Sequence, residues 1–115
     1  MNFDEAITAH SAWKTKLKLY LARPDRSLKA AEVGAPDYCA LGRWIVGEGR
    51  KFAALPEFTK LTAEHAHFHK AAAAVVSRAD AGENVSEEVI LGGRSDFAQA
   101  SSHVVAAIME LKKKV

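Results

Sequence analysis

The sequence contains two histidines, four residues apart, whose side chains could together bind a metal ion. His65 and His69 fall in a stretch with helical periodicity, so both imidazoles should project from one face of a helix, about one turn apart. A pair at this spacing can clamp one metal ion. Such pairs also occur as structural histidines, so the spacing alone is weak evidence for a site.

A third histidine and the single cysteine strengthen the metal hypothesis. His10 lies in the apolar seam predicted for the first helix, and burying several imidazoles among core residues is costly unless they share a partner. A common metal ion removes that cost. Cys39 offers a soft ligand from a predicted helix N-terminus, where the dipole favours the thiolate form. Taken alone, a single cysteine such as Cys39 is more commonly a small buried hydrophobe than a ligand.

Together these residues predict a closed tetrahedral zinc site, with Zn–N bonds of about 2.0 Å and a Zn–S bond of about 2.3 Å. The predicted ligands are His10, Cys39, His65 and His69. A catalytic zinc keeps one position open for water, whereas this site would use all four positions for protein ligands. The zincin motif is also missing, because Ala66 stands where that motif has its glutamate. We therefore predict that the domain is not an enzyme.

Other kinds of site fit the sequence less well. The helix seams contain no glutamate, which carboxylate-bridged di-iron chemistry requires, and the covalent c-type haem motif is absent. His67 and His103 fall off the seams and are predicted to face solvent. Trp13 and Trp44 are predicted to pack in the core without touching the metal.

The apolar periodicity predicts an all-α fold in which a first long helix is followed by a short one. A capping box of Asn2 and Glu5 begins the first helix, which is predicted over residues 2–23. A loop with one short helical turn follows. The next helix, over residues 38–46, is short and carries Cys39 in its first turn.

Two further long helices complete the predicted fold. The third begins at Pro56 and stops at Gly82, and the fourth begins at a second capping box, formed by Asn84 and Glu87. The fourth continues to the end of the sequence. Three long helices and one short helix that carries the cysteine predict an antiparallel four-helix bundle in one domain spanning residues 1–115.

The composition of the chain limits which binding partners and which cellular compartment we expect. The 16 basic and 14 acidic residues give a net charge of +2 and are spread along the chain, which argues against a nucleic-acid partner. No apolar run reaches the length of a membrane span, and Asp4 and Glu5 stand where a secretory signal would be basic. A single cysteine cannot form an intramolecular disulfide. We therefore expect a soluble cytoplasmic protein with no membrane partner.

Three segments of the sequence together resemble a known family. Residues 9–14 (AHSAWK), 39–44 (CALGRW) and 65–69 (HAHFH) are similar, in this order, to the three motifs of the chemoreceptor zinc-binding (CZB) domain family. The resemblance implies a four-helix bundle with a zinc site of three histidines and one cysteine. His10, Cys39, His65 and His69 occupy the corresponding positions.

The resemblance also implies a sensory role in bacterial signalling. Members of the family are usually appended to chemoreceptors or diguanylate cyclases and report zinc availability or oxidants such as hypochlorous acid, and family precedent favours a homodimer. This chain could be a stand-alone member or one domain of a larger protein. Two other functions stay open at this point, which are a structural zinc in a dimerisation or partner-binding bundle and a metal-free Cys/His enzyme.

Overall fold

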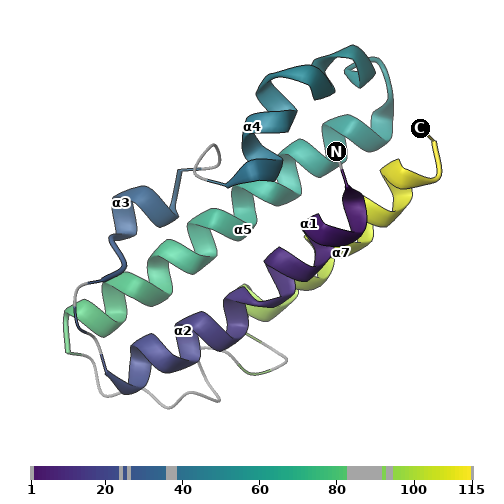
Figure 1. Cartoon of the computed structure of the whole chain (residues 1–115). Helices are drawn as coiled ribbons and strands as arrows, with labels where there is room; N and C mark the ends of the chain where they lie inside the picture. The colour runs from purple at the N-terminus through teal and green to yellow at the C-terminus, as the bar shows by residue number, and fades with distance from the viewer. Residues whose placement is uncertain are drawn as a thin grey trace.

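The computed structural model describes residues 2–23, 25, 27–35, 39–82, 92 and 95–114, and all regular secondary structure within them is helical (Figure 1). In chain order the elements are α1 (Phe3–Ser11), α2 (Trp13–Ala22), α3 (Ala30–Val33), α4 (Ala40–Val46), the 3-10 helix η2 (Glu48–Phe52), α5 (Pro56–Asp80) and α7 (Asp96–Lys112). The predicted all-α class is confirmed. No helix in this described part of the chain has the length and apolar character needed to cross a membrane.

The predicted first helix is present as two helices that follow one another directly. Its N-cap is as expected, because the Asn2 side chain accepts a hydrogen bond from the backbone N–H of Glu5 at 3.0 Å. Ala12 separates α1 from α2 but keeps a helical backbone conformation, and it accepts a hydrogen bond from the N–H of Lys16. The two helices therefore act as one rod, which places His10 and Trp13 in the same interior.

The helix that follows Cys39 begins two positions later than its predicted start. Cys39 has an extended backbone and is the N-cap of α4 rather than a residue of its first turn. Its sulfur accepts a hydrogen bond from the N–H of Gly42 at 3.4 Å, as a capping side chain does. Residue 38, the predicted start of this helix, lies outside the described residues.

The last long helix also begins later than its prediction. Ser95 is the N-cap of α7, and its hydroxyl oxygen accepts a hydrogen bond from the N–H of Ala98 at 3.1 Å. Because Gly92 and Ser95 are not helical, a single helix through both is wrong. The capping box at Asn84 and Glu87 lies outside the described residues. Serine followed by an acidic residue is the local signal that marks the observed start.

Polar pairs across the helices define their directions. Lys60 Nζ lies 3.4 Å from Glu110 Oε2, and His67 Nε2 lies 3.0 Å from Asp96 Oδ1. The later residue of α5 pairs with the earlier residue of α7, so these two helices run antiparallel. Lys112 Nζ lies 2.8 Å from Asp4 Oδ1, which joins the end of α7 to the start of α1. The two helices lie side by side, and α7 is therefore antiparallel to α1 as well (Figure 1). The rod of α1 and α2 consequently runs in the same direction as α5 (Figure 1).

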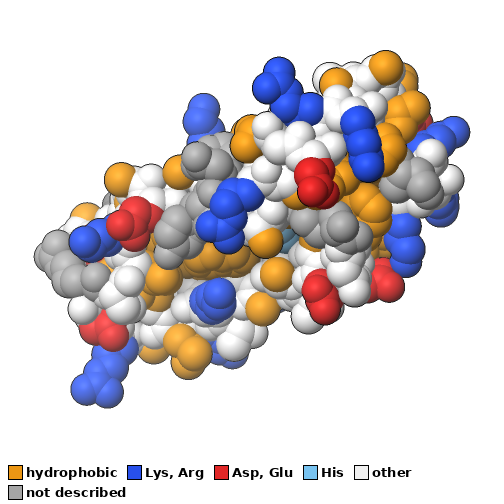
Figure 2. Space-filling model, turned by 45° about the horizontal axis from the view of Figure 1, so that its top comes forward, with side chains coloured by type: hydrophobic (Ala, Val, Ile, Leu, Met, Phe, Trp, Pro, Cys, Tyr) orange, Lys and Arg blue, Asp and Glu red, His pale blue; other side chains and the backbone are white. Residues whose placement is uncertain are grey.

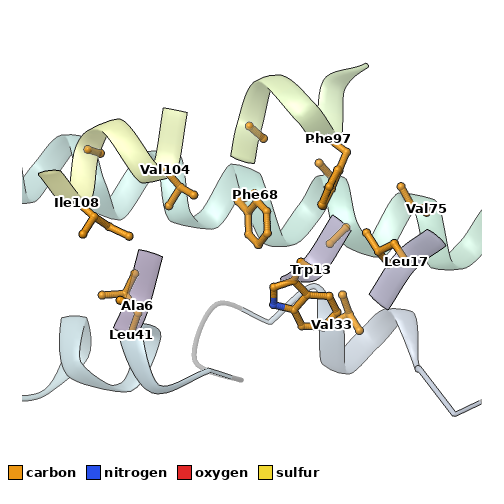
Figure 3. Close-up of a cluster of buried hydrophobic side chains, with 14 of the residues drawn as sticks. Ala6, Trp13, Leu17, Val33, Leu41, Phe68, Val75, Phe97, Val104 and Ile108 are labelled. Atoms are coloured by element: carbon orange, nitrogen blue, oxygen red, sulfur yellow. The ribbon is translucent and has the colours of Figure 1, made fainter. Parts of the chain in front are cut away.

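The core lies between these three rods, and two short helices cover the remaining flank of α5. Phe68 stands near the middle of the core, with Trp13, Phe97 and Val104 around it (Figure 3). On the flank of α5, a Cβ added at Gly34 would lie only 3.1 Å from the Cβ of Ala73, so α3 approaches α5 closely. Three long rods are observed, and the fourth side of α5 is occupied by α3 and α4.

Candidate metal centre

The structure brings all four predicted site residues together. His10 comes from α1, His65 and His69 come from adjacent turns of α5, and Cys39 comes from the N-cap of α4. One nitrogen or sulfur atom from each lies within 4.8 Å of all the others. The three histidines are at most 2% exposed, and Cys39 is half-buried. On the face drawn in Figure 2, only a small area of histidine side chain is visible.

The separations between the four donor atoms fit a small tetrahedral metal ion. The Cys39 Sγ lies 3.2 Å from His65 Nε2, 3.5 Å from His69 Nε2 and 3.9 Å from His10 Nε2, while the Nε2 atoms of His65 and His69 are 3.0 Å apart. Tetrahedral zinc with bonds of about 2.0 Å to nitrogen and about 2.3 Å to sulfur separates two nitrogens by about 3.3 Å and nitrogen from sulfur by about 3.5 Å. The donor set therefore fits zinc, and these four separations lie within about 0.4 Å of the tetrahedral values, while the donor nitrogen of His10 lies within 4.8 Å of those of His65 and His69.

Backbone carbonyls orient two of the imidazoles. His10 Nδ1–H donates to the Ala6 carbonyl oxygen at 2.7 Å, and His69 Nδ1–H donates to the Val33 carbonyl oxygen at 2.8 Å. A carbonyl can only accept, so the proton must sit on Nδ1 and each Nε2 presents a lone pair to the centre. This is the usual arrangement behind a metal-binding histidine. No feature of the sequence predicts these two acceptors, because every residue has a backbone carbonyl whatever its type.

Burial keeps the three histidines neutral. It is the main reason why the pKa of His65 is lowered to about 3, and the proximity of His69 and His10 adds to the effect. Burial also lowers the pKa of His10 and of His69, although the Ala6 and Val33 carbonyls oppose the shift. At neutral pH all three imidazoles are therefore free of the second proton that would block metal binding.

Aromatic packing fixes the segment that carries Cys39. The Trp44 ring meets the Phe3 ring edge-on at 5.5 Å and lies 6.3 Å from the ring of Phe58, which joins α4 to both α1 and α5. A Cβ at Gly49 would lie 2.8 Å from the Trp44 ring, so glycine is needed for this close approach. Trp44 supports the chain around Cys39 from outside the donor cluster.

The other two histidines stay outside the cluster, as predicted. His67 pairs with Asp96 and is 54% exposed, and His103 pairs with Glu64 at 3.5 Å and is 61% exposed. Both lie on the solvent side of the contact between α5 and α7. They provide matched control positions for the buried histidines, His65 and His69.

The protein is a helical domain that carries three histidines and one cysteine in positions to hold a metal ion. The family model of the chemoreceptor zinc-binding domain, CZB, matches residues 10–76, a range that contains all four residues. Because the match covers more than half of the chain, the protein belongs to the CZB family. CZB domains bind zinc and occur in chemoreceptor-type signalling proteins. Comparisons with curated proteins and with solved structures gave no match.

The lowered histidine pKa values predict how the zinc-free protein responds to acid. The unfolded chain takes up protons near pH 6.5, whereas the folded site takes them up only at lower pH. The free energy of unfolding should thus be constant above about pH 7 and fall as the pH drops from about 6.5 towards about 3. Urea unfolding of chelator-treated protein at several pH values measures this.

The control variant is His65→Asn, which removes the histidine whose pKa is lowered to about 3 and leaves the acidic groups in place. Its loss of stability between pH 7 and pH 5 should be smaller than that of the wild type, with the two compared on the same buffers. Equal slopes for the two proteins would contradict neutral burial of His65.

Proposed function

We propose that this chain is a regulatory zinc-binding module of bacterial signalling, in which His10, Cys39, His65 and His69 hold one zinc ion. The observation that carries the proposal is the convergence of four donor atoms from three separate segments on one point in the core. When bound, zinc supplies a divalent positive charge that keeps the thiolate deprotonated and ties those segments together. The carbonyls of Ala6 and Val33 then face imidazole N–H groups made more acidic by the metal.

The placement of Cys39 supports regulation over a purely structural role. The three histidines lie within α1 and within α5, which is 25 residues long, whereas Cys39 lies at the start of α4, which has seven residues. Loss of the sulfur ligand would release the short segment and leave α5 packed against α7. We propose that this local release is the signal. In this account the helices form an antiparallel four-helix bundle whose fourth member is supplied by α3 and α4.

We propose oxidation of Cys39 as one way to trigger the release. The thiolate sulfur attacks the chlorine of hypochlorous acid, the S–Cl bond forms as the O–Cl bond breaks, and hydroxide leaves. Water then displaces chloride from sulfur and gives sulfenic acid, chloride and a proton. Sulfur loses the two electrons that chlorine gains. Sulfenic acid is a much poorer metal ligand than thiolate, so zinc affinity falls.

The same arrangement supports a role other than catalysis. Four protein donors leave no coordination position for a substrate or an attacking water. We propose instead that the domain passes its signal to a chemoreceptor or a diguanylate cyclase. We further propose that it acts in the cytoplasm, where thiols stay reduced, and that it functions as a homodimer. Co-purification of such an output protein with the full chain tests the partner.

The ligand assignment predicts which variants lose metal. Purified protein should contain about one zinc per chain, and replacement of His10, Cys39, His65 or His69 by alanine should remove most of it, because a three-donor site binds far more weakly. Elemental analysis after gel filtration measures the content. The exposed histidine variants His67→Ala and His103→Ala are the controls and should retain full zinc. Metal loss from His67→Ala as complete as that from His65→Ala would refute the assignment.

The redox step predicts zinc release without general unfolding. Stepwise oxidation with hypochlorous acid should release zinc to a chromogenic chelator in proportion to Cys39 modification measured by mass spectrometry. Circular dichroism should retain most of its helical signal, since α4 contributes seven residues against 25 in α5 and 17 in α7.

The control for unrelated oxidation is Met109→Leu, because Met109 is 50% exposed and also reacts with hypochlorous acid. This variant should release zinc like the wild type. Parallel loss of zinc and helicity would favour a structural zinc, and full zinc retention after Cys39 oxidation would eliminate the redox mechanism.

A further inference from the structure

A cavity between α1 and α4 reaches the metal centre on the side of Cys39. It has a volume of about 200 Å³ and is lined by Asn2, Glu5, Ala6, Ala9, His10, Cys39, Ala40 and Leu41. Figure 3 shows two of these residues, Ala6 of α1 and Leu41 of α4, next to each other. Both are buried, as is His10, whereas Ala9 and Ala40 are exposed. The cavity thus leads from the surface to Cys39, the one donor of the four that is not fully buried.

The dimensions of the cavity restrict what can reach the sulfur. A water molecule takes up about 30 Å³ of liquid, so the space accommodates a molecule of a few heavy atoms. Drug-sized ligands occupy pockets of about 300–1,000 Å³, and a peptide thiol is of that size or larger. Ala9 and Ala40, one on each helix, stand at the outer part of the cavity. Their methyl groups leave the space open, and larger side chains there would narrow it.

The lining also discriminates by charge. Glu5 is exposed and is the one acidic side chain among the described residues that line the cavity, and no lysine or arginine is among them. A carboxylate beside the opening repels anions at close range and lowers their local concentration about threefold at low salt. Uncharged molecules are unaffected. The remaining outer surface is largely the methyl groups of alanine.

We propose that this cavity is the entry port through which a small uncharged oxidant reaches the Cys39 sulfur, with Ala9 and Ala40 setting its width and Glu5 disfavouring anions. The proposal rests on the proposed redox function and specifies the class of oxidant. Undissociated hypochlorous acid fits the port, whereas its conjugate anion is disfavoured. The two-electron reaction at the inner end is the one described above, in which hypochlorous acid is the oxidant and Cys39 the reductant.

Two alkylating reagents of nearly equal size test the port on the zinc-loaded full chain. Iodoacetamide is neutral and iodoacetate is an anion, and mass spectrometry gives the rate at which each modifies Cys39. Replacement of Ala9 or Ala40 by leucine should slow both reagents about tenfold, because each side chain would project into the opening. Ala106→Leu, at an exposed position of α7 outside the cavity, is the matched control and should react like the wild type.

Glu5→Gln tests the charge selection. It should leave the iodoacetamide rate unchanged and speed up iodoacetate about threefold at low salt, with the difference disappearing in high salt. Unchanged rates in both leucine variants would overturn the port, and equal acceleration of both reagents by Glu5→Gln would overturn the charge selection.

Zinc release measured in parallel during hypochlorous acid treatment separates the two proposals. If the redox function is wrong, Cys39 will be oxidised without zinc release, but the alkylation rates of the variants will still differ as the port requires. If the port is wrong, the leucine variants will react like the wild type and zinc will still be released.

Discussion

Three imidazole nitrogens and one sulfur converge on a single point inside an apolar domain, and this convergence determines how the surrounding helices must be held. Lone pairs at separations of 3.0 to 3.9 Å repel one another unless a proton or a cation lies between them. Burial disfavours protonation, as the lowered pKa of His65 shows. A metal ion is the partner that satisfies all four groups together, and the zinc-binding family to which the chain belongs supplies its identity.

The shared centre explains how the helices around it are connected to one another. His10 and the α5 histidines join two of the long rods at the centre of the molecule, and the Val33 carbonyl couples His69 to the end of α3. The close contact at Gly34 holds α3 against α5, so the Val33 carbonyl is in place to orient the ring of His69. Cys39 is held differently, by the cap of a short helix and by the aromatic contacts of Trp44. The histidine side of the centre is thus held by the long helices, and the cysteine side is held by a short helix.

Side-chain periodicity was enough to predict the all-helical class and to place the four candidate ligands. His65 and His69 share a helical face whatever the tertiary structure, and the neighbours of His10 at helical spacing are apolar. The positions of Cys39 and Ser95 as N-caps were harder to predict from the sequence. A helix start depends on the backbone conformation of a single residue, and several neighbouring residues could adopt that conformation. The carbonyl acceptors of Ala6 and Val33 could not be predicted at all, since every residue has a carbonyl and only tertiary packing selects one.

X-ray absorption at the zinc edge identifies the atoms bound to the metal in the protein as purified, and it therefore tests the proposed set of ligands without any substitution. We expect a four-coordinate shell of three nitrogens at about 2.0 Å and one sulfur at about 2.3 Å, with the outer-ring scattering typical of imidazole. After oxidation of Cys39, zinc that remains bound should lose the sulfur contribution and keep the nitrogen contribution. A shell without sulfur in the reduced protein, or with more than one sulfur per zinc, would contradict the account.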